Sequence, residues 1–398
     1  MLGKIKELAQ AQASDLTEFR HYLHSRPELS WQEVGTTRDI AAKLADLGIE
    51  YIKTGFGGTE CGIVAEINPG KKGSTVALRA DIDALPLSEE NDLPYRSVRE
   101  GVMHACGHDA HATMLLGAAR ILSAIKNELP GTVRFIFQPA EEHGVKSGAE
   151  TMIKEGALEG VDAIAGLHIW SPFPSGKAGF RGGAIMASAD IWEITVSGQG
   201  GHGSAPQNAV DPTVAAATVI TTMQTVISRE VDPQDTAVLS IGRISSGTAP
   251  NIIPESATMV GNIRTTNPET RSVIPEKMER IMNGICSAFR CSGTLKITNI
   301  YPVTVNDKAL TELARRTAME MLGEDWVIEA PLQMGSEDFS YYGEKVPGTF
   351  FLLGCGNKEK GTDNQHHSPR FNVDDDVLPT GAALLAGFAW KFLSDNGK

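Results

Sequence analysis

The sequence predicts an α/β domain, with a mixed, largely parallel sheet flanked by helices, and a smaller α+β domain inserted into it. A chain of 398 residues is long for one hydrophobic core, so two domains are expected. Strand-like and helical segments alternate over residues 1–184 and 300–398, which is the pattern of an α/β sheet. Residues 185–299 instead follow the order β-α-β-β-α-β, which is the order of a ferredoxin-like unit.

The elements of the first domain follow from the spacing of their apolar residues. Residues 4–25 and 36–48 have helical periodicity, and Pro27 interrupts it between them. Residues 61–67 and 74–86 are predicted strands, joined by a hairpin-type turn rich in glycine. The remaining strands are expected at residues 132–142, 161–170 and within 334–356, and the remaining helices at 110–125, 151–158, 307–322 and 381–393.

The inserted domain is expected to contain two long helices and four strands, with a glycine-rich turn after the first strand. The helices are predicted at residues 211–230 and 267–290, and the strands within 187–206 and at 236–247, 256–266 and 294–303.

Composition excludes several classes of function. The net charge of −13 argues against a nucleic acid or an anionic membrane surface as the main partner. No apolar run approaches the roughly 18–20 residues of a transmembrane helix, and the N-terminus lacks the apolar core of a signal peptide. The five cysteines are scattered and odd in number, so they are no disulfide framework. A reducing cytoplasm is the simplest compartment.

The stretch HACGHDAH, residues 104–111, contains a dense set of potential metal ligands. Three of the ten histidines of the chain lie within these eight residues. His104, Cys106, His108 and His111 carry the imidazole and thiolate groups that bind zinc and its neighbours. Asp109 is a potential ligand or a partner of one. A polar helix start would explain Asp109, but it would not explain a cysteine among three histidines.

Other potential ligands follow strands, as expected where the carboxyl ends of strands meet in an α/β sheet. Asp81 and Asp83 are two apart, so on a strand they share one face. Glu141 and Glu142 are adjacent and can serve one site only if the strand has ended and the chain turns there. His168 ends a further apolar segment. The pair His366 and His367 lies in a polar loop, where simple solvent exposure is an equally good interpretation.

The chain resembles the superfamily of aminoacylases and carboxypeptidase-like metallopeptidases. Within it, the chain is most similar to the amidohydrolase subgroup of hippurate hydrolases, N-acetyl-amino-acid deacetylases and plant indole-acetyl-amino-acid hydrolases. Its marks span nearly the whole chain and are HYLHSRPELSWQE (21–33), LRADIDALP (78–86), MHACGHDAH (103–111), FQPAEE (137–142), LHIW (167–170), GHGSAP (201–206), NIIPESA (251–257), MGSEDF (334–339) and HHSPRF (366–371).

The resemblance implies a catalytic domain with two divalent cations, of zinc, manganese, cobalt or nickel, and an inserted domain that serves as lid and dimer interface. The implied general base is Glu141, which takes a proton from a metal-activated water. Cys106 is expected to be a bridging or terminal thiolate, and His104, His111 and His366 are not expected to be ligands. The implied metal ligands are Cys106, His108, Glu142, His168 and His367.

Further roles follow from the same resemblance. Asp81 stands where the wider superfamily has a metal-binding histidine, and which of Asp81 and Asp83 is the functional acid stays open. His202 is implied to reach a neighbouring subunit's active site and to stabilise the oxyanion. Asn251 and Arg264 are implied to hold the carboxylate of the substrate.

The predicted function is hydrolysis of the amide bond of N-acyl amino acids by a cytoplasmic homodimer, with a small-molecule substrate and neither nucleic acid nor membrane as partner. The alternatives are a dipeptidase or carboxypeptidase of the same superfamily, and an inactive metal-binding or ligand-binding protein on this scaffold.

Overall fold

The structure is a computed structural model that describes residues 1–396, and the chain divides into two compact units. The first unit contains Met1–Ile185, Val305–Leu332 and the chain from Asp338 onward. The second unit contains Met186–Thr304 and the short segment Gln333–Glu337. The prediction had assigned that short segment to the first domain.

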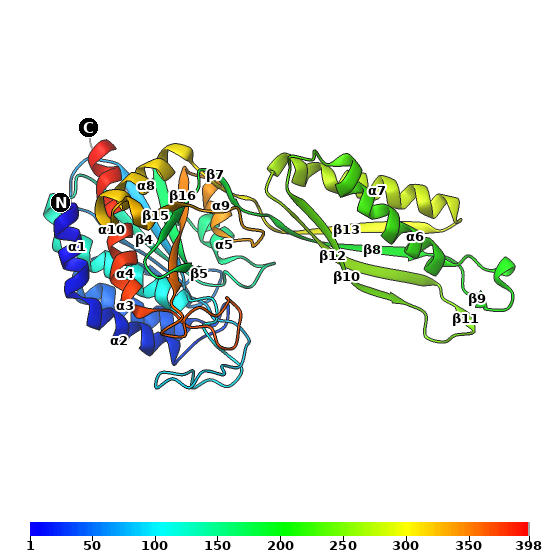
Figure 1. The fold of residues 1–398 in the computed structure, drawn as a ribbon, viewed down its shortest axis with the longest axis horizontal. Coiled ribbons are helices and arrows are strands. Elements are labelled where there is room, and N and C mark those ends of the chain that lie inside the picture. Colours follow the sequence, from blue (N-terminus) through cyan, green and yellow to red (C-terminus); the bar gives the residue numbers. More distant parts are fainter. Residues whose placement is uncertain (397–398) are drawn as a thin grey trace. The chain divides into compact units, whose positions relative to one another are not determined.

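An eight-stranded sheet forms the centre of the first unit (Figure 1). From edge to edge its strands are β1 (Tyr51–Thr54), β2 (Ile63–Ile67), β4 (Thr132–Gln138), β3 (Thr75–Asp81), β5 (Ala163–Pro174), β16 (Gly348–Gly356), β6 (Ala178–Phe180) and β15 (Val327–Glu329). The four central strands β4, β3, β5 and β16 are parallel. Antiparallel pairs flank them on both sides. The predicted mixed, largely parallel sheet is therefore confirmed.

The hairpin predicted between β2 and β3 is wrong. Both strands pair with β4, which lies between them, β2 antiparallel and β3 parallel. The segment of residues 68–73 therefore crosses over β4 to connect β2 with β3. The physical reason is that β4 is almost entirely buried, so its backbone N–H and C=O groups need hydrogen-bond partners on both edges. Strands β2 and β3 provide these partners, which they could not do if they paired with each other in a hairpin.

Helices cover both faces of this sheet. They are α1 (Leu2–Ala11), α2 (Ala13–His24), α3 (Val34–Asp46), α4 (His108–Ala124), α5 (Gly148–Lys154), α8 (Lys308–Leu322), α9 (Phe339–Gly343) and α10 (Leu378–Asn396). The helix predicted over residues 4–25 is broken at Gln12, whose backbone leaves the helical region and whose side chain donates to the carbonyl of Gly117. Short 3-10 helices occur at Lys126–Glu128, Pro206–Asn208, Glu324–Trp326 and Asp375–Val377.

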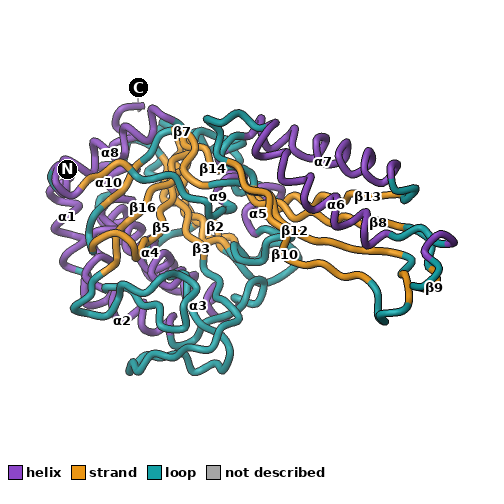
Figure 2. Tube along the Cα trace, turned by 45° about the vertical axis from the view of Figure 1, so that its right-hand side comes forward, coloured by secondary structure: helices purple, strands orange, loops and turns teal. Residues whose placement is uncertain are grey.

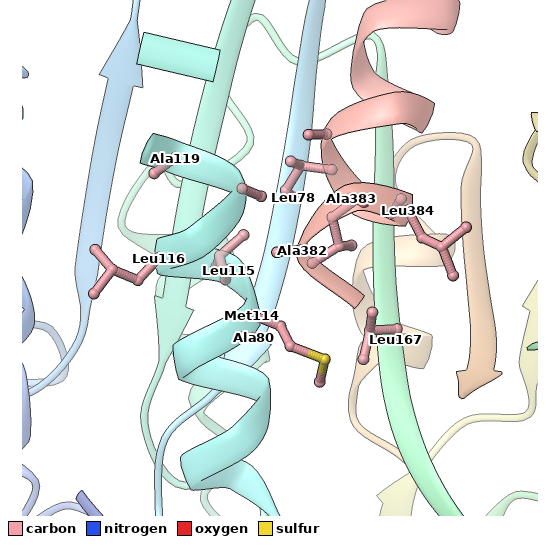
Figure 3. Close-up of a cluster of buried hydrophobic side chains, with 14 of the residues drawn as sticks. Leu78, Ala80, Met114, Leu115, Leu116, Ala119, Leu167, Ala382, Ala383 and Leu384 are labelled. Atoms are coloured by element: carbon pink, nitrogen blue, oxygen red, sulfur yellow. The ribbon is translucent and has the colours of Figure 1, made fainter. Parts of the chain in front are cut away.

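The core lies where α4 and α10 pack side by side on β3 and β5 (Figure 3). Small residues allow this close approach, because a Cβ on Gly381 would lie 1.9 Å from the Met114 sulfur. Leu167 faces these helices, whereas its neighbour Gly166 faces Phe339 of α9 on the opposite side. Among the described residues, one helical stretch, Asp375–Asn396, is long and apolar enough to span a membrane. The apolar 18-residue window of that stretch is 78% buried, as in a core helix.

The second unit has a four-stranded antiparallel sheet with two helices on one face (Figure 2). In chain order its elements are β8 (Ala189–Ser197), α6 (Pro212–Thr225), β10 (Ala237–Ser246), β12 (Ser256–Thr265), α7 (Pro268–Ala288) and β13 (Ser292–Tyr301). The sheet order β10-β12-β8-β13 is that of a ferredoxin-like fold, as predicted. The end of the first predicted helix is a π-helix, Val226–Glu230. Two small pairs complete the chain: β9 (Gly201–His202) with β11 (Ile252–Ile253), and β7 (Gly183–Met186) with β14 (Thr304–Asn306).

Candidate metal centre

Two overlapping groups of metal-binding atoms share the thiol of Cys106. The first group is Cys106, His108 and His168, and the second is Cys106, Glu142 and His367. Within each group the ligand atoms lie within 4.8 Å of one another. The structure thus brings together all five ligands that the resemblance implied, from segments up to 261 residues apart in the chain (367 − 106).

Gly107 separates two of the potential ligands, Cys106 and His108, and its conformation allows both to reach the site. Its φ of +86° is a left-handed conformation, and it forms the N-cap of α4, which begins at His108. A Cβ at this position would lie only 2.1 Å from Cδ1 of Ile169 on β5. Glycine therefore allows Cys106 and His108 to lie directly against the strand that carries His168.

The imidazole of His108 is oriented for a cation. The residue is buried, and its Nδ1 lies 3.0 Å from Oδ1 of Asp83. Its Nε2 is also buried and has no hydrogen-bond partner among the described residues. A buried ring nitrogen without a partner is costly, and a carboxylate behind the opposite nitrogen is the usual support of a metal-binding histidine. The residues present therefore fit a metal ion.

Asp81 and Asp83 have different contacts, which separates the two acids. Asp83 orients His108, and its other oxygen accepts from the backbone N–H of Glu142 at 2.9 Å. Asp81 accepts instead from Arg79 and from Nδ1 of His111, at 2.8 and 2.5 Å.

His111 uses both of its ring nitrogens within the protein. The backbone N–H of Ile169 donates to its Nε2 at 2.9 Å, so the proton of a neutral ring is on Nδ1, which faces Asp81. His111 therefore joins α4 to β5 and has no lone pair left for a metal.

His104 and Asp109 belong to none of the donor groups found among the described residues. Asp109 accepts from Nε of Arg20 at 3.0 Å and from Nδ1 of His24 at 2.8 Å, so it anchors α2 to the start of α4. The suggestion that Asp109 supports a ligand is not what its contacts show. His104 is fully buried, and burial lowers the pKa of its imidazole to about 4, so the ring is neutral.

His168 lies inside a strand and not at its end, since β5 continues to Pro174. Its ring nevertheless belongs to the first donor group, and the pairing of β3 with β5 ends two residues earlier, at Gly166. Nδ1 of His168 donates to the carbonyl of Ile169 at 2.5 Å, and Nε2 lies 3.4 Å from Sγ of Cys106. Burial holds the pKa of His168 well below its usual value, so the ring is a neutral potential ligand.

The two adjacent glutamates share one site because the chain turns immediately before them. β4 ends at Gln138, and Ala140 has a left-handed φ of +54°. Glu141 and Glu142 both lie within 4.8 Å of His108, measured between ligand atoms. The chain therefore has the turn that was expected if both glutamates are to serve one site.

The loop with two histidines directs only the second one to the other donors. His367 has a φ of +63°, and its backbone N–H donates to the carbonyl of Ala105, next to the cysteine. Its Nε2 lies 3.1 Å from Oε1 of Glu142. His366 belongs to no donor group among the described residues: its Nε2 donates to the carbonyl of Ile169 at 3.0 Å, and its ring stacks on Trp170.

The donor set attracts a cation because it combines buried ligands with several acids. Burial raises the pKa of the Cys106 thiol, and the charges of Glu142 and Glu141 raise it further. Burial disfavours a charged His108, but the charges of Asp81 and Asp83 outweigh this and raise its pKa to about 10. A divalent cation held by these residues would displace both protons, because only thiolate and neutral imidazole are ligands.

Comparison with known proteins shows the family of the chain that carries this site. The sequence model of peptidase family M20/M25/M40 matches residues 77–391. The chain belongs to this family.

Relatives of this M20-family chain cover nearly its whole length. It is 41% identical to thermostable carboxypeptidase 1 of Saccharolobus solfataricus, over 98% of this chain and 99% of the relative. It is 40% identical to N-acetylcysteine deacetylase of Bacillus subtilis, over 94% and 96%. A solved structure of a dinuclear metal-binding M20 peptidase from Bacillus subtilis has a TM-score of 0.85 at 37% identity, covering 97% of this chain and 99% of that one. The predicted superfamily is confirmed, and the chain is a metal-dependent hydrolase of amide or peptide bonds.

The second unit of this M20-family chain carries the other three predicted site residues. His202 and Asn251 lie together, because β9 pairs with β11 and Gly203 donates to the carbonyl of Asn251. Asn251 precedes the start of β12 at Ser256, whereas Arg264 lies near the end of β12, where it donates to the carbonyl of Met334. At about 3.3 Å per residue, the strand separates Arg264 from Ser256 by roughly 26 Å. The structure therefore does not bring Asn251 and Arg264 together within one chain.

Several residues of the site were not identified from the sequence. Ser30 donates to Asp83 at 2.7 Å, and Glu33 accepts from the backbone of Ala140 at 2.8 Å. The only sequence signal for them was their place in RPELSWQE. Three of the four non-glycine residues with positive φ among those described, Trp31, Ala140 and His367, also lie in segments around the donor groups.

Proposed function

We propose that the protein hydrolyses the amide bond of N-acyl amino acids with two divalent cations bound at this centre. The observation that carries the proposal is the pair of donor groups that share Cys106. A thiolate can bridge two cations, and each cation would have two further protein ligands. His108 and His168 would complete one site, and Glu142 and His367 the other.

The surrounding residues supply the remaining chemistry. A pair of divalent cations lowers the pKa of a coordinated water and polarises the amide carbonyl. Glu141, which lies beside His108 and Glu142, takes the proton of the attacking water and delivers it to the leaving nitrogen. Asp83 orients His108 and holds the backbone of Glu142. Asp81 contributes indirectly, through its hydrogen bonds to Arg79 and His111.

The second unit is proposed to act as the lid and the dimer interface of a homodimer. His202 would stabilise the oxyanion, and Asn251 and Arg264 would bind the substrate carboxylate. β12 separates Arg264 from Ser256 in one chain by roughly 26 Å, and the β9–β11 pair next to Asn251 lies beyond the Ser256 end (Figure 1), so Arg264 and Asn251 are farther apart than a small substrate spans. Two chains must therefore contribute if both residues bind one carboxylate, which supports the proposal that His202 and Asn251 act in the neighbouring subunit.

A carboxypeptidase or dipeptidase activity is the second candidate. It is favoured by the 41% identity to thermostable carboxypeptidase 1. A free α-amino group on the substrate distinguishes the two, since an N-acyl amino acid lacks it.

The test is a substrate panel with defined metal loading. N-acetyl and N-benzoyl amino acids are assayed beside free dipeptides, after exhaustive chelation and after return of Zn²⁺, Mn²⁺, Co²⁺ or Ni²⁺. We expect hydrolysis of the N-acyl amino acids to disappear on chelation and to return with metal. Faster cleavage of dipeptides would favour the second candidate, and undiminished activity after chelation would refute the metal mechanism. No hydrolysis of any substrate by metal-loaded protein would favour an inactive binding protein. We place the enzyme in the cytoplasm, because all five cysteines are free thiols.

A further inference from the structure

The segment of residues 30–33 contacts both strand ends that carry the acids of the metal centre. Ser30 donates to Oδ2 of Asp83, which follows β3. Glu33 accepts from the backbone N–H of Ala140, which follows β4, at 2.8 Å. Trp31 donates from its indole to the carbonyl of Lys146, beyond the glutamate pair in the same loop. This segment therefore holds the loop between β4 and α5 near both of its ends.

Ala140 has a conformation that an alanine does not adopt without support. Its φ is +54°, it is fully buried, and it directly precedes Glu141. The left-handed region disfavours any residue with a Cβ. Its carbonyl accepts from Gly148, and its N–H is held by Glu33. A change of the dihedral angles at this residue would redirect Glu141 and Glu142 together.

Glu33 is itself an expensive residue to bury. Its side chain is fully buried, and its Oε2 has no hydrogen-bond partner among the described residues. Burial and the nearby charge of Asp83 raise its pKa to about 8. Burying a carboxyl has a desolvation cost, and the hydrogen bond that Glu33 makes in return is to the residue that precedes the glutamate pair.

We propose that Glu33 is a positioning residue that holds the left-handed turn at Ala140 and thereby aims Glu141 and Glu142 at the metal centre. The proposal rests on the proposed function for the roles of the two glutamates. The reasoning requires only the hydrogen-bond acceptor of Glu33 and not a negative charge.

The experiment compares four variants with the wild type. Glu33→Ala removes the acceptor, Glu33→Gln keeps it, and Glu33→Ala combined with Ala140→Gly removes the need for it, because glycine adopts positive φ freely. Asp162→Ala is the matched control: Asp162 also accepts a backbone N–H, that of Thr75 at 2.8 Å, at the opposite end of β3. The retention of Zn²⁺ is measured by competition with a chelator, without substrate. The kcat, the KM and the melting temperature are measured in parallel.

We expect Glu33→Ala to weaken Zn²⁺ retention and to lower kcat by about tenfold or more, because the competent turn becomes a minor conformer. Its KM should stay within about threefold of wild type, and Glu33→Gln should match the wild type within the same margin. The double variant should recover most of the Zn²⁺ retention. Asp162→Ala should lower the melting temperature without changing retention or kcat. If Glu33→Ala does not fold, Glu33→Asp, which is one methylene too short to reach Ala140, takes its place.

Wild-type Zn²⁺ retention and kcat in Glu33→Ala would overturn the proposal. A glutamine variant as impaired as the alanine variant would also overturn it, since the charge and not the acceptor would then matter. A double variant no better than Glu33→Ala would show that the conformation of Ala140 is not the route. Because retention is measured without substrate, a wild-type protein that hydrolyses no amide would refute the proposed function and leave this test valid.

Discussion

Gly107→Ala tests whether the close approach of α4 to β5 determines the metal centre. The φ of +86° imposes the left-handed cost of an L-residue, about 1–2 kcal/mol. The new Cβ would lie 2.1 Å from Cδ1 and 2.8 Å from Cγ1 of Ile169, and overpacking of this kind costs about 1–3 kcal/mol. Together the two terms should destabilise the first unit by about 2–5 kcal/mol. Any relief moves Cys106 or His108, so metal retention should fall as well.

Two further variants separate these terms. Gly101 also has a positive φ, +73°, but a Cβ there would meet no atom within 4 Å. Gly101→Ala should therefore show only the left-handed cost, about 1–2 kcal/mol, with normal metal retention. Ile169→Val removes the Cδ1 atom that causes the closest contact. Alone, this substitution should destabilise the protein by about 0.5–1.5 kcal/mol. In the Gly107→Ala background it should leave the stability unchanged or increase it.

The assay is differential scanning calorimetry of the five proteins, namely wild type, the three single variants and the double variant, with Zn²⁺ retention measured on the same samples. At about 2–4 °C per kcal/mol for a domain of this size, Gly107→Ala should melt at least about 4 °C below wild type. The reasoning fails if Gly107→Ala is no worse than Gly101→Ala. It also fails if Ile169→Val costs the same in both backgrounds, because contacting residues should show coupling.

Three other predictions test the roles of single side chains. Glu141→Gln should lower kcat by about 10²–10⁴-fold while the metal content measured by elemental analysis is unchanged, and near-normal turnover would show that another group is the base. His367→Ala should weaken metal retention by more than about 100-fold, whereas His366→Gln, which keeps a donor for the carbonyl of Ile169, should retain metal; equal losses would contradict the assignment of His367 as the ligand. For His24, burial opposes protonation, but the charge of Asp109 and hydrogen bonds to Asp109 and Glu89 raise its pKa. Its stabilisation is therefore complete below its ordinary pKa of about 6.5 and is lost as the pH rises through the folded-state pKa. The melting temperatures of metal-loaded wild type and His24→Gln should differ most near pH 6, by an amount equivalent to about 3 kcal/mol, and a difference that grows with pH would have the wrong sign.

Much of the site could be predicted from the sequence because its chemistry is local. Cys106 and His108 flank one glycine, and Glu141 and Glu142 are adjacent, so three proposed ligands and the proposed base lie in two short stretches. The alternation of strands and helices and the order of the inserted unit are local patterns too, which is why the fold class was predicted correctly. The hairpin between β2 and β3 was not, because strand order depends on which distant strand pairs with each edge.

Only the tertiary structure decided between similar residues close together in the chain. Asp81 and Asp83 are two residues apart at the end of β3, but Asp83 contacts His108 and Asp81 contacts His111. His366 and His367 are neighbours, but only His367 reaches Glu142. His111 is excluded as a ligand by a backbone N–H of Ile169, which no side-chain pattern reveals. The physical reason is that residue type determines which atoms can bind a metal, whereas the partner within about 3 Å, set by strand register and loop conformation, determines which of them do.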